Sequence, residues 1–128
     1  AIVDHMKNNK YGKIVNISSG RAFKGSPDFL HYDASKAAVL GITRSLAREV
    51  GDDGINVNAL APGSTASENV LARQTDKGVT MESTIASRAL KRMETPEDLI
   101  GACLFLASSD SDFMTGQSLV VDGGSVMH

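Results

Sequence analysis

The stretch that decides the fold spans residues 12–62, "GKIVNISSGRAFKGSPDFLHYDASKAAVLGITRSLAREVGDDGINVNALAP". An apolar run at residues 12–18 is followed by a loop rich in glycine and proline, and apolar residues then recur at helical spacing over residues 30–50. A second apolar run, residues 55–62, ends at a proline. Short apolar runs bounded by turn residues are typical of buried strands, so the stretch predicts a strand–helix–strand unit.

The flanking sequence extends this alternation. Residues 1–9 have the spacing of the last turns of a helix, residues 95–109 predict a further helix, and residues 117–124 a final short strand. This order predicts an α/β fold, with a parallel sheet covered by helices on both faces. Because three strands leave two exposed edges, we expect residues 1–128 to be the C-terminal part of a larger, doubly wound domain.

Composition excludes several classes of function. The 13 basic and 15 acidic residues are balanced, whereas nucleic-acid and membrane-surface binding require clustered positive charge. No apolar run is long enough to cross a bilayer and no signal peptide opens the chain, so a cytoplasmic location is expected. The single cysteine, Cys103, lies among apolar residues and is predicted to be a core thiol of a reducing compartment, with no metal site.

Two motifs in the first half of the chain can carry chemistry. Tyr32 and Lys36 are four residues apart, which places both side chains on one face of the predicted helix. A nearby ammonium group favours the ionised form of a phenol, which makes the tyrosine a better acid and base near neutral pH. Ser19 follows the first strand, at the end where α/β sheets assemble their sites, and its hydroxyl can hydrogen-bond a substrate oxygen.

Each motif alone has an ordinary structural explanation. A tyrosine and a lysine four apart occur by chance in many helices, and two serines after a strand are a common turn. An acyl-transfer arrangement of Ser19 and His31 can be drawn, but the sequence lacks the G-x-S-x-G nucleophile elbow. A serine hydrolase therefore remains an alternative to a proton-transfer site at Tyr32 and Lys36.

Taken together and in order, the motifs resemble those of the short-chain dehydrogenase/reductase family. "GKIVNISS" resembles the strand that leads to the family's catalytic serine, "YDASK" matches its Y-x-x-x-K signature, and Ser19 precedes Tyr32 by 13 residues, the usual interval, which favours Ser19 over Ser18. "INVNALAPG" and "TPEDLIGACLFLASSDSDFMTGQSLVVDGG" resemble later elements of the family. The resemblance covers essentially the entire chain, which corresponds to the C-terminal half of a family member.

The resemblance implies a Rossmann-like fold and reversible hydride transfer between NAD or NADP and a carbonyl or secondary alcohol. The alternative is a non-catalytic member of the family that binds a dinucleotide or a partner. It implies that Tyr32 is the general acid and base, that Lys36 assists it and binds the nicotinamide ribose, and that Ser19 orients the substrate carbonyl. The cofactor-binding residues implied are Tyr32, Lys36, Pro62, Gly63, Thr65 and Ser67, the last where the family usually has threonine.

The resemblance also suggests partners. Likeness to 3-oxoacyl-carrier-protein reductase-type members implies a 3-oxoacyl thioester or another ketone as substrate, while the C-terminal ending resembles members that oxidise aromatic secondary alcohols. The helix at residues 30–50 is apolar on two sides, as in the homodimers and homotetramers of the family. The family's glycine-rich turn has no counterpart here, so the 128 residues alone are predicted to be inactive and poorly folded.

Overall fold

The computed structural model describes residues 2–68, 70 and 81–128. Its elements follow in the order α1 (Ile2–Asn9), β1 (Gly12–Ile17), α2 (Arg21–Lys24), α3 (Leu30–Val50), η1 (Gly51–Asp53), β2 (Ile55–Pro62), α5 (Met81–Ala86), α6 (Glu97–Ala107), η2 (Ser109–Ser111) and β3 (Ser118–Val121). The strands and long helices predicted from the sequence are present, with bounds that differ by three residues at most. Residues 64–90, which the sequence analogy to the family would place over the site, lie partly outside the described residues.

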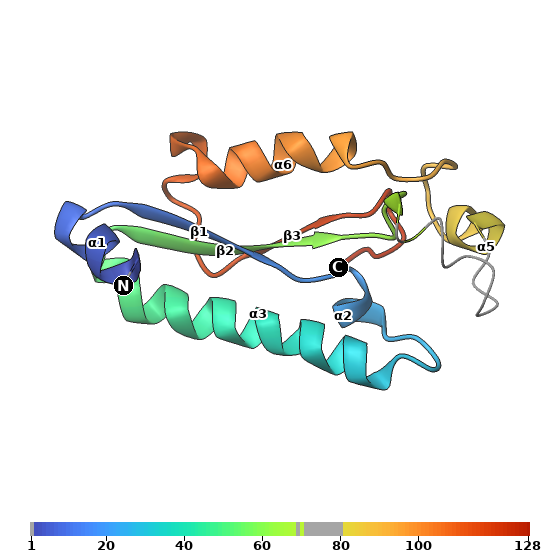
Figure 1. The fold of residues 1–128 in the computed structure, drawn as a ribbon, viewed down its shortest axis with the longest axis horizontal. Helices are drawn as coiled ribbons and strands as arrows, with labels where there is room; N and C mark the ends of the chain where they lie inside the picture. Colours follow the sequence, from blue (N-terminus) through green and yellow to red (C-terminus); the bar gives the residue numbers. More distant parts are fainter. Residues whose placement is uncertain (1, 69, 71–80) are drawn as a thin grey trace.

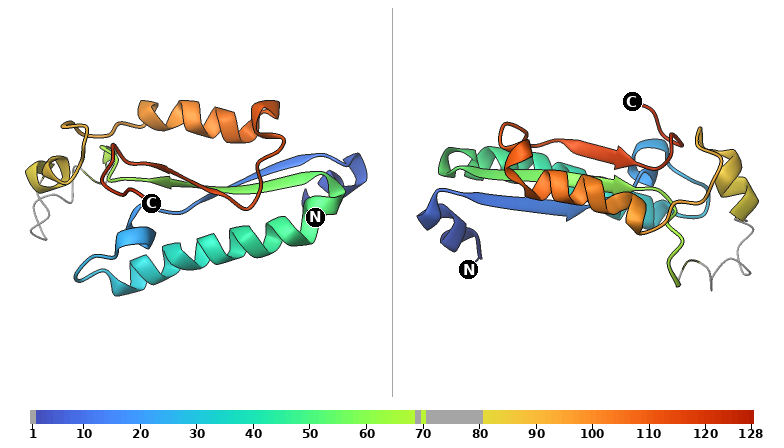
Figure 2. Two further views of the ribbon diagram at one scale, coloured as in Figure 1. Left: turned by 180° about the vertical axis from the view of Figure 1, so that it is seen from behind. Right: turned by 90° about the horizontal axis from the view of Figure 1, so that it is seen from above.

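The three strands form a parallel sheet in the order β1-β2-β3 (Figure 2). Strand β2 is central: it pairs with β1 from Ile55 to Leu60 and with β3 from Ala59 to Pro62. Most of its residues are buried, because helices cover both faces of the sheet. The predicted α/β architecture with a parallel sheet is confirmed.

Helix α3 covers one face of the sheet and helix α6 the other (Figure 1). The buried residues of α3, namely Leu40, Thr43, Ala47 and Val50, recur every three to four positions and so form one stripe facing the sheet. The central core joins the end of this stripe to the start of β2. The apolar periodicity of α3 therefore determines which of its faces packs on the sheet. Helices α3 and α6 enclose the strands between them.

The turn between α3 and β2 requires a glycine. Helix α3 ends at Val50, η1 follows, and Gly54 then adopts a left-handed conformation with φ of 72°. A Cβ atom at Gly54 would collide with the carbonyl oxygen of Lys10. The "GDDG" sequence therefore ends the helix as predicted and lets β2 begin beside the start of β1.

The outer faces of both long helices carry exposed apolar side chains. On α3 these are Leu30 and Ile42, and on α6 they include Ile100 and Leu104. Cys103 is also exposed, so its prediction as a core thiol is wrong. The cause is that α6 is apolar around much of its circumference, and Leu106 is its buried side chain. Among the described residues, no helix has both the length and the hydrophobicity needed to span a membrane.

Candidate active site

The two serines after β1 have different environments. Pairing with β2 continues past the strand, because the Ser18 N–H donates to the Leu60 carbonyl (2.8 Å) and the Gly20 N–H to that of Pro62 (2.9 Å). The Ser18 hydroxyl donates to the carbonyl of Lys36 on α3 (2.8 Å), so it ties strand to helix. The Ser19 hydroxyl oxygen accepts a long hydrogen bond from the Arg21 N–H (3.3 Å), and within the described residues the hydroxyl donates to no partner.

Tyr32 and Lys36 lie on adjacent turns of α3. The Lys36 ammonium nitrogen lies 5.8 Å from the centroid of the Tyr32 ring and donates a hydrogen bond to the Ile17 carbonyl (3.1 Å). That carbonyl belongs to the last residue of β1, directly before the two serines. The helix thus holds the phenol and the ammonium group beside the end of the strand.

A cavity of about 1160 Å³ opens at the carboxyl ends of the strands. Five of the seven residues predicted for catalysis or cofactor binding line it, namely Ser19, Tyr32, Gly63, Thr65 and Ser67. The other two are not among its lining residues: the Lys36 ammonium group donates to the Ile17 carbonyl at the end of β1, and the Pro62 carbonyl accepts the Gly20 N–H. The structure therefore brings five of the seven predicted residues to one cavity.

Residues 63–66, called here the 63–66 loop, form one wall of this cavity. The Thr65 hydroxyl donates to a carboxylate oxygen of Glu94 (2.7 Å), and the Thr65 carbonyl accepts the Ser67 N–H (2.8 Å). Gly63 has no room for a side chain, because a Cβ atom there would lie 2.7 Å from Glu94 Oε2 and 2.9 Å from Asp122 Cβ. Glu94 and Asp122 can therefore pack directly against the backbone of this loop.

Three buried charged residues behind the loop were not predicted from the sequence. Arg88, Glu94 and Asp122 are 3%, 4% and 4% exposed. Burial raises the pKa of Glu94 above its ordinary value, although the Thr65 hydroxyl and the Arg88 guanidinium act in the opposite direction. Sequence periodicity carries no signal for such residues, because charged side chains are usually exposed and their burial depends on distant segments.

A fourth residue that was not predicted is Arg21, which lines the same cavity as Ser19 and Tyr32. Its guanidinium carbon lies 3.9 Å from the Phe29 ring centroid and 5.9 Å from that of Tyr32. Its Nε donates to Asp33 Oδ1 (3.1 Å). Because the adjacent carboxylate offsets the Arg21 charge, the guanidinium orders the wall of the cavity around Tyr32 through packing.

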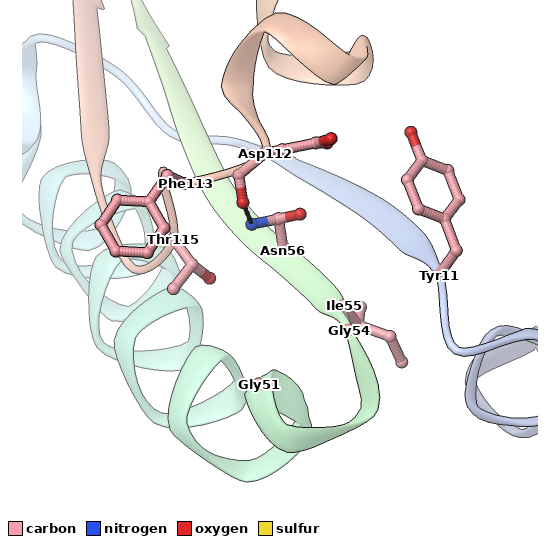
Figure 3. Close-up of a pocket in the computed structure, with 8 residues that line it drawn as sticks. All are labelled: Tyr11, Gly51, Gly54, Ile55, Asn56, Asp112, Phe113 and Thr115. Carbon is pink, nitrogen blue, oxygen red and sulfur yellow. Dashed lines mark hydrogen bonds between the residues drawn. The ribbon is translucent and has the colours of Figure 1, made fainter.

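A second, smaller cavity lies at the amino ends of the strands (Figure 3). Tyr11, Asn56, Asp112 and Phe113 are among its lining residues. Asn56 donates its side-chain N–H to the Asp112 carbonyl (2.9 Å) and its amide oxygen accepts from Lys13 (2.9 Å), so these polar groups satisfy one another. Within the described residues no group of three or more histidine, cysteine or acidic side chains could hold a metal ion.

The chemistry available at the carboxyl end is proton transfer and hydrogen bonding. Tyr32 offers a phenol, Ser19 a hydroxyl donor and Lys36 a positive charge beside the phenol, while the 63–66 loop contributes to the wall of the cavity. These groups can bind a carbonyl oxygen and exchange a proton with it, whereas the residues described here supply no redox centre of their own.

Comparisons with known proteins show the family to which the chain belongs. A family model described as "Enoyl-(Acyl carrier protein) reductase" matches residues 1–126. The chain is 41% identical over 127 residues to "3-oxoacyl-[acyl-carrier-protein] reductase FabG" of Rickettsia bellii, with 98% of the chain and 51% of that protein covered. It is 44% identical over 120 residues to "2-dehydro-3-deoxy-D-gluconate 5-dehydrogenase" of Dickeya dadantii, with 93% and 47% covered.

A solved structure with the same fold carries a cofactor. It is a gluconate 5-dehydrogenase from Burkholderia cenocepacia in complex with NADP and tartrate, with a TM-score of 0.88 and 34% identity. The match covers 95% of this chain and 48% of that one, so the chain spans about half the length of the relatives it matches. On the family model and the shared fold, the chain belongs to the short-chain dehydrogenase/reductase family.

Proposed function

We propose that the chain forms the catalytic half of an oxidoreductase that transfers hydride between NAD or NADP and a carbonyl or secondary alcohol. The observation that carries this proposal is the convergence of Ser19 and Tyr32 on one cavity, with the Lys36 ammonium 5.8 Å from the Tyr32 ring. The family's relatives with dehydrogenase and reductase names support it.

In the direction of reduction, Tyr32 donates its phenolic proton to the carbonyl oxygen of the substrate, and in oxidation its phenolate takes the proton from the alcohol. The Lys36 ammonium group stabilises the phenolate through its positive charge. The Ser19 hydroxyl donates a hydrogen bond to the same substrate oxygen and holds it against Tyr32. When bound, the nicotinamide supplies or accepts the hydride.

The residues present fit a nicotinamide at the 63–66 loop. Gly63, Ser64 and Thr65 line the cavity, so a planar ring bound there would contact the backbone of this loop. Pro62 and Ser67 flank the loop, and Tyr32 and Lys36 would bind the nicotinamide ribose. The chain does not distinguish NAD from NADP in this proposal, since both share the nicotinamide half.

The chain is proposed to be the C-terminal part, residues 1–128, of one larger domain. Strand β1 is an edge of the described sheet, and Ile17 at its end is 52% exposed. A preceding segment that adds parallel strands beside β1 would cover this edge and supply the site for the adenosine half of the cofactor. Without it, the 128 residues are expected to unfold without cooperativity and to turn over no substrate.

Oligomeric state, location and substrate are further parts of the proposal. The exposed apolar residues of α3 and α6 favour a homodimer or homotetramer that buries them. The location we propose is the cytoplasm. A 3-oxoacyl thioester and a keto sugar acid are the first substrates to test, because relatives carry those names. A phenylethanol is the third, on the likeness of the C-terminal ending.

The decisive experiment is Tyr32→Phe in the complete protein, which also separates an enzyme from a non-catalytic binding protein. Loss of the phenol should lower turnover by about 10²- to 10⁴-fold, with the affinity for the reduced cofactor retained. The measurement is cofactor absorbance during turnover, together with a fluorescence titration of the cofactor. Tyr11→Phe, at the other end of the sheet, is the matched control and should retain full turnover. Equal activity of both variants would refute the assignment of Tyr32.

A further inference from the structure

Arg88 and Glu94 together hold every residue of the 63–66 loop. Glu94 Oε2 accepts the Gly63 N–H (3.2 Å), which also donates to the Val121 carbonyl (3.0 Å). Glu94 Oε1 accepts the Thr65 hydroxyl (2.7 Å), and the Glu94 carbonyl accepts the Ala66 N–H (2.7 Å). Arg88 Nη2 donates to the carbonyl of Ser64 (2.8 Å).

The Arg88 and Glu94 side chains form a buried ion pair. Arg88 Nη2 lies 3.7 Å from Glu94 Oε2, and the two side chains are 2% and 5% exposed. Arg88 Nη1 donates to the Arg92 carbonyl (3.0 Å), which fixes the guanidinium from behind. Burying two charges costs several kcal/mol per ion, and apolar residues of similar size often stabilise a fold equally well. The pair offers what apolar residues lack: directed hydrogen bonds to the backbone of one loop.

We propose that Arg88 and Glu94 are positioning residues, which fix the backbone of the 63–66 loop at the place where the nicotinamide binds. This inference rests on the proposed function, because it takes that loop as the cofactor-facing wall of the cavity. Gly63 packs directly on the pair, since a Cβ atom there would lie 2.7 Å from Glu94 Oε2 and 3.1 Å from Arg88 Nη2. A shift of either side chain would therefore move the loop.

Asp122 extends the same support to the other side of the cavity. Its carboxylate accepts the N–H groups of Gly124 (3.0 Å), Ser125 (3.0 Å) and Val126 (2.9 Å), which orders the turn after β3. Asp122 Oδ2 would lie 3.0 Å from a Cβ atom at Gly20, directly after Ser19. The loop, the turn and the end of β1 are thus packed against one group of buried charges.

The test compares Arg88→Met, Glu94→Leu and the double variant in the complete protein. Each single variant leaves one buried charge without its partner and should lower the melting temperature strongly, whereas the double variant removes both charges and should recover most of it. If the pair positions the loop, the double variant should still bind the reduced cofactor at least about tenfold more weakly, since the bonds to Gly63, Ser64 and Thr65 are gone. Hydrogen exchange in residues 63–66 should be faster than in the wild type.

A double variant with restored stability, wild-type cofactor affinity and unchanged exchange would overturn the inference, because the pair would then only stabilise the fold. Arg92→Met is the matched control, since the exposed Arg92 side chain binds Asp98 and its loss should leave the cofactor affinity unchanged. If the double variant does not fold, Glu94→Gln is the second variant, because it keeps the size of the side chain. It should still weaken cofactor binding and speed hydrogen exchange in residues 63–66. No change in cofactor affinity or in exchange would also overturn the inference. A wild-type protein that binds no nicotinamide cofactor would instead contradict the proposed function, and loop exchange would still report on the pair.

Discussion

The two ends of the sheet each place a lysine beside a tyrosine at nearly the same distance. At the amino end, Lys13 Nζ lies 5.9 Å from the centroid of the Tyr11 ring, and at the carboxyl end, Lys36 Nζ lies 5.8 Å from that of Tyr32. By this distance alone, the two pairs are equivalent. Their surroundings differ in charge compensation and in access to a cavity with other reactive groups.

At the amino end the lysine is neutralised. Lys13 Nζ lies 2.7 Å from Asp112 Oδ1 and donates to Asn56, so its charge is offset within the same network. At the carboxyl end the ammonium of Lys36 donates to a neutral carbonyl, and no ion pair of Lys36 is present in the part of the chain that the structure describes. The comparison teaches that a tyrosine–lysine pair becomes a candidate for proton transfer only where the positive charge remains uncompensated.

The largest expected effect distinguishes the two lysines. Lys36→Met in the complete protein should lower kcat/KM by about 10- to 1000-fold, because the phenolate of Tyr32 loses its stabilising charge. Lys13→Met should leave kcat/KM unchanged and lower the free energy of unfolding by about 1 kcal/mol, through lost hydrogen bonding. Steady-state kinetics and urea unfolding of both variants measure this. Equal losses of kcat/KM would show that charge compensation does not distinguish the two ends.

An intermediate effect distinguishes two glycines. Gly63→Ala should lower the free energy of unfolding by about 1–3 kcal/mol, because its Cβ atom would overlap Glu94 and Asp122, and should weaken cofactor binding. Gly51, at the amino end, has helical φ and ψ of −62° and −40° and open space around a Cβ position. Gly51→Ala should therefore raise stability by about 0.4–1 kcal/mol. Urea unfolding checks both values, and a tolerated alanine at Gly63 would contradict the close packing of the loop.

The smallest expected effect concerns two half-buried carboxylates. Asp98 lies near the carboxyl end of the sheet. Its carboxylate accepts hydrogen bonds from two guanidinium nitrogens of Arg92 (2.6 Å each) and from the Thr95 N–H (2.8 Å), and these bonds hold the pKa of Asp98 well below its ordinary range. Asp53, near the amino end, has its pKa lowered by Lys10 and Lys7. Because both pKa values are lower in the folded state, the stabilisation is present above the ordinary pKa of an aspartate and is lost as the pH falls through the folded value.

Asp98→Asn should therefore lower the melting temperature by a few degrees at neutral pH, and the difference from the wild type should shrink as the pH falls to about 3. Asp53→Asn should behave in the same direction with a smaller difference, since its partners are two flexible lysines and not a two-point arginine contact. Thermal unfolding across this pH range measures both. A difference that grows on acidification would contradict the sign.

The sequence predicted the elements that depend on local patterns. The helix Leu30–Val50 agrees with the prediction at both ends, because its apolar residues repeat every three to four positions and a glycine-rich turn follows. The four-residue spacing of Tyr32 and Lys36 placed both on one helical face for the same reason. Short apolar runs likewise located β1 and β2, since buried strands need consecutive apolar residues.

Other features could not be predicted because they depend on contacts between distant segments. Ser18 and Ser19 are neighbours of one type, and only the position of α3 decides that Ser18 bonds to the Lys36 carbonyl while Ser19 lines the cavity. The exposure of Cys103 follows from which side of α6 faces the sheet.

The sequence by itself determined that a parallel α/β unit forms and that a phenol, an amine and a hydroxyl follow one another at the right spacing, because helix and strand periods act over a few residues. Only the tertiary structure decided that Lys36 has no ion-pair partner among the described residues while Lys13 is paired, and that Arg88 and Glu94 are buried behind the 63–66 loop. The physical reason is that burial and charge pairing arise where segments dozens of residues apart meet, and no local pattern encodes that meeting.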